Sequence, residues 1–291
     1  MPNTAHFRFP AEPRAAHRNP PPAVALSTNR TTKEACSMDY SVALVTGASR
    51  GIGAAIAAAL IAEGLVVHAL ARDAAALAAL ADVLGPNLKP LPADVRDISG
   101  IAAALGDIAL DVLVNNAGGV ASVRPLQSQT PDETAETIAL NLTAPLHLMQ
   151  IVLPGMVRRG RGHIFNLTST VASAVFPGTT AYAAAKAGLS QAGRVIRHDL
   201  AGSGVRLTEI APGRVETEFY LRAFDGNREG LRESMYTHQR ALRPEDIARV
   251  LVAALKLPDH VDIAEMIVSP SEQAPGGHTF PMLAETPSKT P

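Results

Sequence analysis

Short apolar runs alternate with segments of helical composition along most of the chain. The runs that predict buried strands are residues 41–46, 65–71, 88–94, 112–115, 163–169, 205–210 and 263–269. The segments that predict helices are residues 51–63, 74–83, 131–158 (one helix or two), 181–200 and 244–257. Strands that alternate with helices pair in parallel and carry helices on both faces of their sheet. The pattern therefore predicts an α/β fold with a doubly wound parallel sheet of about seven strands.

The two ends of the chain lack this alternation. Residues 1–38 contain the triplet Pro20–Pro22 and no sustained period. We expect a disordered extension there rather than a transit peptide, because the prolines would break the amphipathic helix of such a peptide. The last residues are rich in Pro and Gly and predict a flexible tail at 274–291. Composition does not change between these ends, which predicts one domain over residues 39–273.

Composition narrows the class of protein. The 291 residues include 26 basic and 27 acidic side chains, a formal charge of −1, and aromatic residues make up only 4 %. Because nucleic-acid binding needs basic excess and stacking side chains, no nucleic-acid partner is expected. The longest uncharged apolar stretch near the start, residues 51–62, is shorter than the about 20 residues of a membrane span. Cys36 is the only cysteine and no histidine pair has metal-ligand spacing, so we expect no disulfide, no metal, no membrane partner and a cytoplasmic location.

A glycine-rich turn joins the first predicted strand to the first predicted helix. Gly47 allows a tight turn, Gly51 lets a diphosphate approach the backbone, and Gly53 lets the helix pack close to the sheet. The free N–H groups at the start of the helix attract phosphates. Glycines alone are weak evidence, because many turns need them. Here a predicted strand precedes the turn and a predicted helix follows it, and this context predicts nucleotide binding in a Rossmann domain.

Four motifs, in sequence order, are similar to those of the short-chain dehydrogenase/reductase family. They are Thr46-Gly47-x-x-x-Gly51-x-Gly53, Asn115-Asn116-Ala117-Gly118, Tyr182-x-x-x-Lys186 with Ser169 upstream, and Pro212-Gly213 followed by Thr217. The resemblance covers about residues 40 to 272. It implies a nicotinamide-dependent enzyme that acts on CH–OH groups of a small-molecule substrate.

The residues after the second strand favour NADP over NAD. Ala71 stands where NAD-using family members carry Asp, and Arg72 follows it. A guanidinium binds a 2′-phosphate with two hydrogen bonds, and Arg50 matches the second basic position of NADP-using members. Asp73 comes one residue late for a ribose contact and is expected to cap the next helix. We therefore predict NADP as the cofactor.

The resemblance also implies the remaining cofactor contacts. The full set is Gly47, Ser49, Arg50, Gly51, Ile52 and Gly53 in the turn, Arg72, Asp94 and Val95 beside the adenosine, Asn116, Ala117 and Gly118 after the fourth strand, Tyr182 and Lys186, and Pro212, Gly213, Val215 and Thr217 near the nicotinamide.

Tyr182 and Lys186 are the predicted catalytic pair. They are four residues apart on a predicted helix, so their side chains lie on one face. A neighbouring ammonium is expected to lower the pKa of the phenol from its usual value of about 10, so that Tyr182 exchanges a proton with a carbonyl or alcohol oxygen. Ser169 is expected to hydrogen-bond the same oxygen. The resemblance adds Asn141, on the preceding helix, as the residue that holds a water of the proton relay.

Within the family, stretches 243–248 and 257–263 resemble NADP-dependent 3-hydroxy acid dehydrogenases, also called L-allo-threonine or serine dehydrogenases. Three alternatives stay open: a 3-oxoacyl carrier-protein reductase, a general ketone reductase, and a non-catalytic NADP sensor. Carrier-protein reductases usually carry a glycine-rich segment before the last strand, and this chain has none. The basic cluster Arg158, Arg159 and Arg161 is either a solvated turn or a docking site for an acidic carrier.

An acidic substrate needs a cation to compensate its carboxylate. Arg214, Arg222 and Arg228 follow the sixth strand, and Arg214 is the first choice because it comes directly after Pro212-Gly213. If all three face solvent, Phe219, Tyr220 and Phe224 favour a neutral ketone instead. The resemblance also implies a homotetramer built on the helices of Asn141 and Tyr182.

Overall fold

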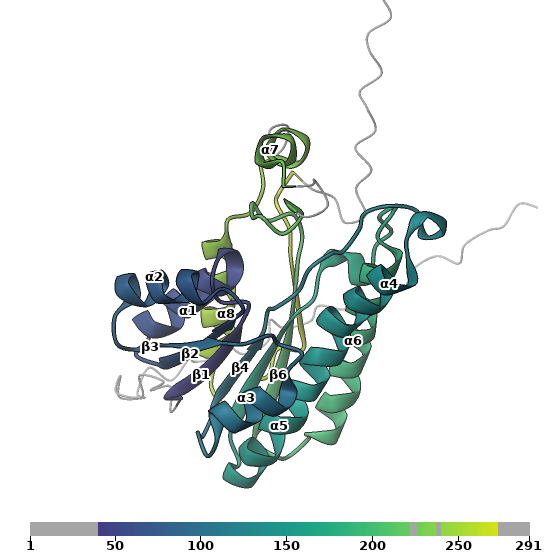
Figure 1. Ribbon diagram of the computed structural model, residues 1–291. Helices are drawn as coiled ribbons and strands as arrows, with labels where there is room; N and C mark the ends of the chain where they lie inside the picture. The colour runs from purple at the N-terminus through teal and green to yellow at the C-terminus, as the bar shows by residue number, and fades with distance from the viewer. Residues whose placement is uncertain (1–39, 222–225, 237–239, 273–291) are drawn as a thin grey trace, which may run out of the picture. The chain divides into compact units, whose positions relative to one another are not determined.

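A seven-stranded parallel sheet forms the centre of the computed structural model, which describes residues 40–221, 226–236 and 240–272. The strands are β1 (Val42–Thr46), β2 (Val66–Ala71), β3 (Leu88–Pro92), β4 (Val112–Asn115), β5 (Gly162–Leu167), β6 (Val205–Pro212) and β7 (Glu265–Val268). Their order is β3-β2-β1-β4-β5-β6-β7, so the order reverses between β1 and β4 (Figure 1). Ligands of open α/β sheets bind at such a switch point, beyond the carboxyl ends of the strands. The predicted extension and tail lie outside the described residues.

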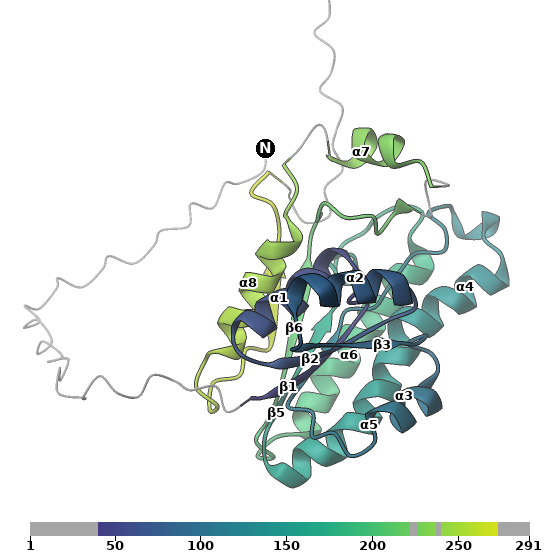
Figure 2. The ribbon, with the colours of Figure 1, turned by 60° about the vertical axis from the view of Figure 1, so that its left-hand side comes forward.

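Helices cover both faces of the sheet (Figure 2). They are α1 (Gly51–Ala62), α2 (Ala74–Leu84), α3 (Ile98–Leu105), α4 (Pro131–Ile138), α5 (Ala144–Arg159), α6 (Thr180–Asp199), α7 (Arg228–Tyr236) and α8 (Pro244–Leu255). Helices α1, α2 and α8 share one hydrophobic core with the sheet, and α3, α5 and α6 share the other. Alternate residues of β1 serve the two cores, since Ala43 and Val45 lie in the first and Leu44 in the second. The doubly wound prediction is confirmed.

The long helical segment predicted at 131–158 is two α-helices joined by one turn of π-helix, η2 (Ala139–Thr143). The stretch Pro131–Arg159 contains an 18-residue window with a mean hydropathy of 1.3, and it is long and apolar enough, by length and composition alone, to cross a membrane. Its inner face instead supplies Leu148, Met149 and Met156 to the core beside the sheet. Only 33 % of its most apolar window is buried within the chain, so much of its apolar surface faces outward.

Two helices lie where no helix was predicted from the sequence. Helix α3 has only eight residues, and its start is fixed by the Asp97 carboxylate, which accepts a hydrogen bond from the Gly100 N–H at 3.0 Å. Gly106, in the left-handed region at φ 49°, ends it. Helix α7 lies in the segment between β6 and α8 and has only nine residues, four of them charged.

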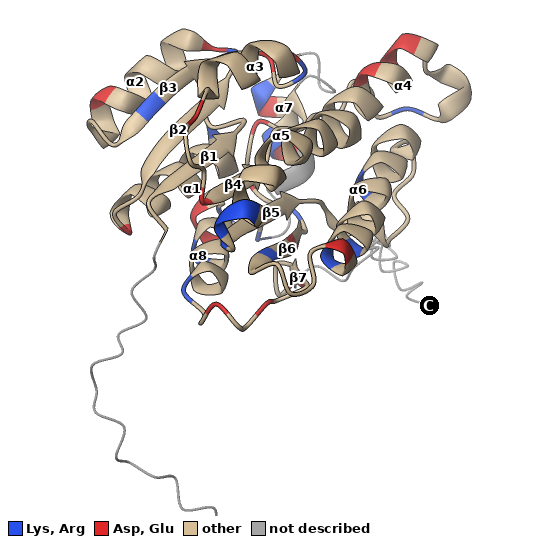
Figure 3. Cartoon of the chain, turned by 90° about the horizontal axis from the view of Figure 1, so that it is seen from below, with Lys and Arg blue, Asp and Glu red and all other residues tan. Residues whose placement is uncertain are grey.

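Charged residues at the amino end of the sheet are tied into the fold (Figure 3). The buried carboxylate of Asp111 accepts hydrogen bonds from the Ser41 N–H at 2.8 Å and the Val42 N–H at 3.3 Å. Arg161 lies 3.3 Å from the same carboxylate, and Arg159 donates to the backbone carbonyl of Leu110. Arg159 and Arg161, two of the three clustered arginines, therefore bind the segment before β4, which in turn binds the start of β1.

The glycine turn before α1 leaves no room for a side chain at Gly53. A Cβ atom there would lie 2.2 Å from the Gly47 carbonyl oxygen and 2.6 Å from the Asn116 amide nitrogen. Gly47 has φ 66°, the left-handed conformation that favours glycine. The first turn of α1 therefore packs directly on the backbone that follows β1.

We predict that Gly53→Ala destabilises the protein by about 1–3 kcal/mol, because the new methyl group overpacks against rigid backbone. Gly155→Ala, in the interior of α5, is the matched control, because its Cβ would meet only the flexible ends of two arginine side chains, Arg159 at 3.2 Å and Arg158 at 3.9 Å. This control should be neutral or slightly stabilising, since Ala is the better helix former. Urea unfolding of both variants measures the difference, and equal stabilities would contradict the close packing at Gly53.

Candidate active site

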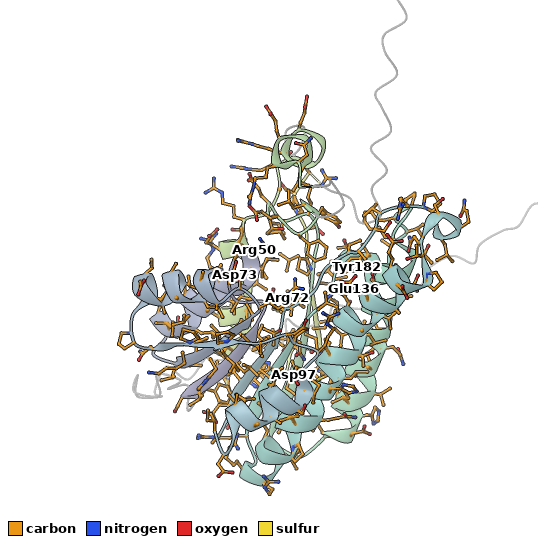
Figure 4. All side chains as sticks on the ribbon, viewed as in Figure 1. Arg50, Arg72, Asp73, Asp97, Glu136 and Tyr182 are labelled. Atoms are coloured by element: carbon orange, nitrogen blue, oxygen red, sulfur yellow. The ribbon has the colours of Figure 1, made fainter. Side chains whose placement is uncertain are left out.

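A cleft of about 1150 Å³ lies beyond the carboxyl ends of the strands, at the switch point of the sheet. Its lining includes these residues that the sequence predicted: Gly47, Ser49, Arg50, Gly51, Ile52, Arg72, Asp94, Val95, Asn116, Ala117, Gly118 and Thr217. Figure 4 shows Arg50, Arg72 and Asp73 on one side of this region and Glu136 and Tyr182 on the other. The predicted cofactor residues therefore come from distant parts of the chain to one cleft.

The glycine turn forms an anion-binding end of the cleft. Gly51 has φ 55°, and a Cβ atom there would meet only Thr217, at 3.4 Å or more, so this backbone is open toward the cleft. No side chain caps the start of α1, and its first turn carries no acidic residue. Its N–H groups are thus available to a negatively charged group. This geometry fits the diphosphate of a dinucleotide.

A hydrogen-bonded link fixes the glycine turn to the end of β4. The Thr46 hydroxyl donates to the Val114 carbonyl at 3.1 Å and accepts from the N–H groups of Asn116 and Ala117 at 3.0 and 2.9 Å. The Asn116 side-chain amide donates back to the Thr46 carbonyl at 2.8 Å. The sequence placed Thr46 in the glycine motif but did not predict this linking role. The only signal for the role was its position as the first residue of the glycine turn.

Basic residues lie where β2 ends. Exposed Arg72 follows Ala71 and lines the cleft, and within the described residues no ion pair joins it. The Asp73 carboxylate accepts from the Ala76 N–H at 3.0 Å, which confirms that it caps α2. Arg50 lies 3.0 Å from Glu218, a residue of the loop after β6 that the sequence analysis missed.

Asp94 is held by its neighbour Arg96. The Arg96 guanidinium donates to both carboxylate oxygens, at 2.9 and 2.6 Å, and these bonds lower the pKa of Asp94 to about 2. Asp94 is therefore an acceptor across the working range of most enzymes. Arg96 and Glu136 also line the cleft and were not predicted.

The four predicted catalytic side chains come from three elements. Asn141 lies on η2, Ser169 directly after β5, and Tyr182 and Lys186 on α6. The Lys186 ammonium donates to the backbone carbonyl of Leu167 at 2.7 Å and lies 5.8 Å from the centre of the Tyr182 ring. All but Ser169 are almost fully buried.

Asn141 reaches the loop that follows β4. Its amide donates to the carbonyls of Gly119 at 2.7 Å and of Thr137 at 2.9 Å, and its oxygen accepts from the Gly119 N–H at 3.3 Å. Asn141 lies in the π-helical turn, which orients its side chain toward this loop. Its bond to the Thr137 carbonyl is a contact within the same helical segment, four residues earlier. A Cβ atom at Gly118 would lie 2.8 Å from the Asn141 oxygen and 3.6 Å from the Lys186 nitrogen. The two side chains thus converge beside Gly118.

Burial governs the protonation of the catalytic pair. It raises the pKa of Tyr182, nearby Tyr220 raises it further, and a hydrogen bond with Ser169 opposes both. Burial lowers the pKa of Lys186 to about 8, while Glu209 opposes that change. The pKa of Tyr182 in the protein alone is thus raised, opposite to the expected lowering, because burial disfavours the phenolate.

The loop after β6 closes the site from the other side. Phe219 packs on Tyr182 with ring centres 5.5 Å apart, and Tyr220 packs edge-on against Phe219 at 5.0 Å. Pro212 accepts a hydrogen bond from the Ser169 hydroxyl at 3.5 Å. Val215 packs into the core on the α1 and α8 side.

Some predicted site residues do not line the cleft. They are Gly53, Asn141, Ser169, Tyr182, Lys186, Pro212, Gly213 and Val215, which include the four predicted catalytic residues. Arg222 and Phe224 lie outside the described residues.

Comparison with known proteins decides the family. The family model described as short chain dehydrogenase matches residues 41–227. The chain belongs to the short-chain dehydrogenase family. These enzymes are oxidoreductases, so the chain is assigned to an enzyme family whose four motifs it carries intact.

Several family members are similar over most of their length. An uncharacterized short-chain type dehydrogenase/reductase of Sinorhizobium fredii is 41 % identical over 84 % of this chain and 97 % of its own. The NADP-dependent 3-hydroxy acid dehydrogenase of Escherichia coli is 36 % identical over 81 % of this chain and 97 % of its own. A closed form of serine dehydrogenase complexed with NADP⁺ superposes with a TM-score of 0.78 at 36 % identity, covering 81 % of this chain and 98 % of that one.

Proposed function

We propose that this short-chain dehydrogenase is a cytoplasmic NADP(H)-dependent enzyme that transfers hydride between NADPH and the carbonyl of a small 3-oxo or 3-hydroxy acid or a related ketone or alcohol. The observation that carries the proposal is the cleft itself. Arg72 and Arg50 line it at one end, with no carboxylate in the NAD-selecting position. At the other side, the lining residues Phe219 and Gly118 lie against the buried side chains of Tyr182 and Lys186.

The cofactor site follows from the lining of the cleft. The α1 N-terminus and Gly51 take the diphosphate, and Arg72 takes the 2′-phosphate. Arg50 reaches the same phosphate once it leaves Glu218. Asp94 and Val95 flank the adenine. Asn116 contacts the adjoining ribose with its main chain, because its side-chain amide is bound to the Thr46 carbonyl.

The nicotinamide half of the site lies toward β6. Thr217, with the backbone of Pro212, Gly213 and Val215, contacts the carboxamide. Val215 contributes only its backbone there, because its side chain packs in the core.

The catalytic residues supply the proton and hold the substrate oxygen. The bound cofactor supplies or accepts the hydride. Because burial raises the pKa of Tyr182, its phenol is neutral and donates a proton to the carbonyl oxygen in the reduction. The reverse reaction needs the phenolate, which the Lys186 ammonium stabilises. Ser169 donates a hydrogen bond to the same oxygen, and Asn141 holds the relay water beside Lys186.

The substrate class is proposed from similarity to the 3-hydroxy acid and serine dehydrogenases. A 3-oxoacyl-[acyl-carrier protein] reductase of Brucella melitensis is also similar, at 26 % identity and a TM-score of 0.71, over 80 % of this chain and 91 % of that one. The basic cluster does not favour carrier docking, because Arg159 and Arg161 are bound to Leu110 and Asp111 at the opposite end of the sheet. Arg214 remains the proposed partner of the substrate carboxylate.

A homotetramer is part of the proposal. The outward apolar surface of the 131–159 stretch and the exposed Val157 and Val195 on α5 and α6 suit packing against further copies of the chain. Light scattering at micromolar concentration tests this assembly, and a monomer would count against it.

We predict that Arg72→Ala raises the KM for NADPH roughly ten- to a hundredfold and leaves the KM for NADH within about twofold, since only NADPH carries the 2′-phosphate. Arg249→Ala is the matched control, because Arg249 is exposed, pairs with Asp246 and does not line the cleft. Steady-state kinetics with both cofactors measures the split. Equal effects on NADPH and NADH would exclude Arg72 as the phosphate ligand.

We predict that wild-type enzyme oxidises 3-hydroxybutyrate or serine in preference to a neutral secondary alcohol of similar size. Arg214→Ala should then cost the acid about 2–4 kcal/mol of transition-state binding, roughly 30- to 1000-fold in kcat/KM, and leave the alcohol nearly unchanged. A wild-type preference for the neutral alcohol would replace the acid substrate by a general ketone.

A further inference from the structure

A carboxylate that the mechanism does not use lies directly behind the catalytic pair. Glu209 is on β6, where it faces Asn166 of β5 and Glu265 of β7 in the sheet register. Its side chain is buried although it carries a charged group. Burying a carboxylate is costly unless it is hydrogen-bonded or paired, so its partners indicate what it does.

Two hydroxyl groups hold this carboxylate, one at each oxygen. The Thr168 hydroxyl donates to Oε1 at 2.6 Å, and the Ser190 hydroxyl donates to Oε2 at 2.8 Å. Both groups are buried. Each oxygen of the carboxylate therefore accepts one hydroxyl hydrogen bond.

The two donors belong to the two elements that carry the catalytic residues. Thr168 is the residue before Ser169, and the Leu167 carbonyl just before it accepts the Lys186 ammonium at 2.7 Å. Ser190 lies one turn beyond Lys186 on the inner face of α6. The Glu209 carboxylate therefore links the end of β5 to the helix of Tyr182 and Lys186.

We propose that Glu209 is a positioning residue whose buried carboxylate fixes the end of β5 to α6 through Thr168 and Ser190 and places a negative charge near Lys186. The proposal rests on the proposed function, because that function assigns Lys186 its role. No ion pair joins Glu209 to Lys186 among the described contacts, so the hydrogen bonds position the two elements while the charge acts on Lys186 across the intervening space.

The surroundings of Lys186 single out Glu209 as the source of negative charge. On α6 it faces Tyr182, on η2 the uncharged Asn141, and on the β4 loop Gly118. The end of β5 offers it only a backbone carbonyl. Burial lowers the pKa of Lys186 to about 8, and Glu209 on β6 is the group that raises it. Without this charge the pKa of Lys186 falls further.

The test compares Glu209→Gln with Ser190→Ala. The first removes the charge and keeps the shape, and the second removes one hydrogen bond and keeps the charge. In wild type, kcat for NADPH-dependent ketone reduction should fall on the alkaline side of its pH profile. In Glu209→Gln we expect this fall to occur about one pH unit lower. Ser190→Ala should leave the pH of the fall unchanged and lower kcat by the same factor at every pH.

Thermal unfolding gives a readout that needs no activity. At pH 6 Lys186 is charged in both proteins, so Glu209→Gln loses the full interaction and its Tm falls furthest below wild type. At pH 9, above the Lys186 pKa of about 8, the ammonium is mostly neutral and the difference in Tm should narrow. The Tm deficit of Ser190→Ala should be the same at both pH values.

If Glu209→Gln does not fold, Glu209→Asp replaces it, because Asp keeps the charge but withdraws it by one methylene group. This variant should shift the alkaline fall of kcat in the same direction by a smaller amount. If neither variant shifts this fall and the loss of Tm does not depend on pH, the proposal is overturned and Glu209 has only a structural role. A wild-type enzyme without NADPH-dependent activity would instead overturn the proposed function, and the Tm comparison would still decide the role of the Glu209 charge.

Discussion

A lysine ammonium buried next to Tyr182, the proposed proton donor, is the constraint on which the site depends. Lys186 has no access to bulk water, so the protein itself must satisfy its charge. The Leu167 carbonyl does so directly, at 2.7 Å, and this bond requires β5 and α6 to keep a fixed spacing. Small and hydroxyl-bearing residues on the inner face of α6, such as Ala185 and Ser190, let the helix lie this close to the sheet.

The same demand for close approach shapes the other end of the cleft. The glycine turn contacts the start of α1 without any side chain between them, and Thr46 and Asn116 bind this turn to the end of β4. Both ends of the cleft are thus held by short polar contacts at the carboxyl edge of the sheet. A dinucleotide that spans the cleft meets a site that is already assembled, which limits the ordering cost of binding.

Sequence patterns predicted the regular parts of this protein because the residues there carry a local signal. Apolar runs predicted all seven strands. Of the motif residues, those of the glycine turn at 47 and 51, the Asn116–Gly118 segment and Thr217 line the cleft. The Asp73 cap was predicted in the same way, from a short polar residue directly before a helical segment.

What the sequence did not reveal depends on contacts between distant residues. Glu218 meets Arg50 across a separation of 168 positions, and Glu209 meets Thr168 across 41, with no spacing rule for either. The pKa of Tyr182 was predicted in the wrong direction, because spacing reveals the neighbouring ammonium but not the depth of burial. Helix α7 escaped prediction because it has only nine residues, four of them charged, so its apolar face is small.

Proton transfer by Tyr182, while the rest of the site binds the cofactor, is the step on which the proposed function depends. Tyr182→Phe tests it most directly, with Tyr220→Phe as a control on the loop tyrosine nearby. Fluorescence titration should show NADPH binding within about threefold of wild type in both variants, and turnover of a ketone substrate should be lost only in Tyr182→Phe. Turnover near the wild-type rate in Tyr182→Phe would contradict the claim.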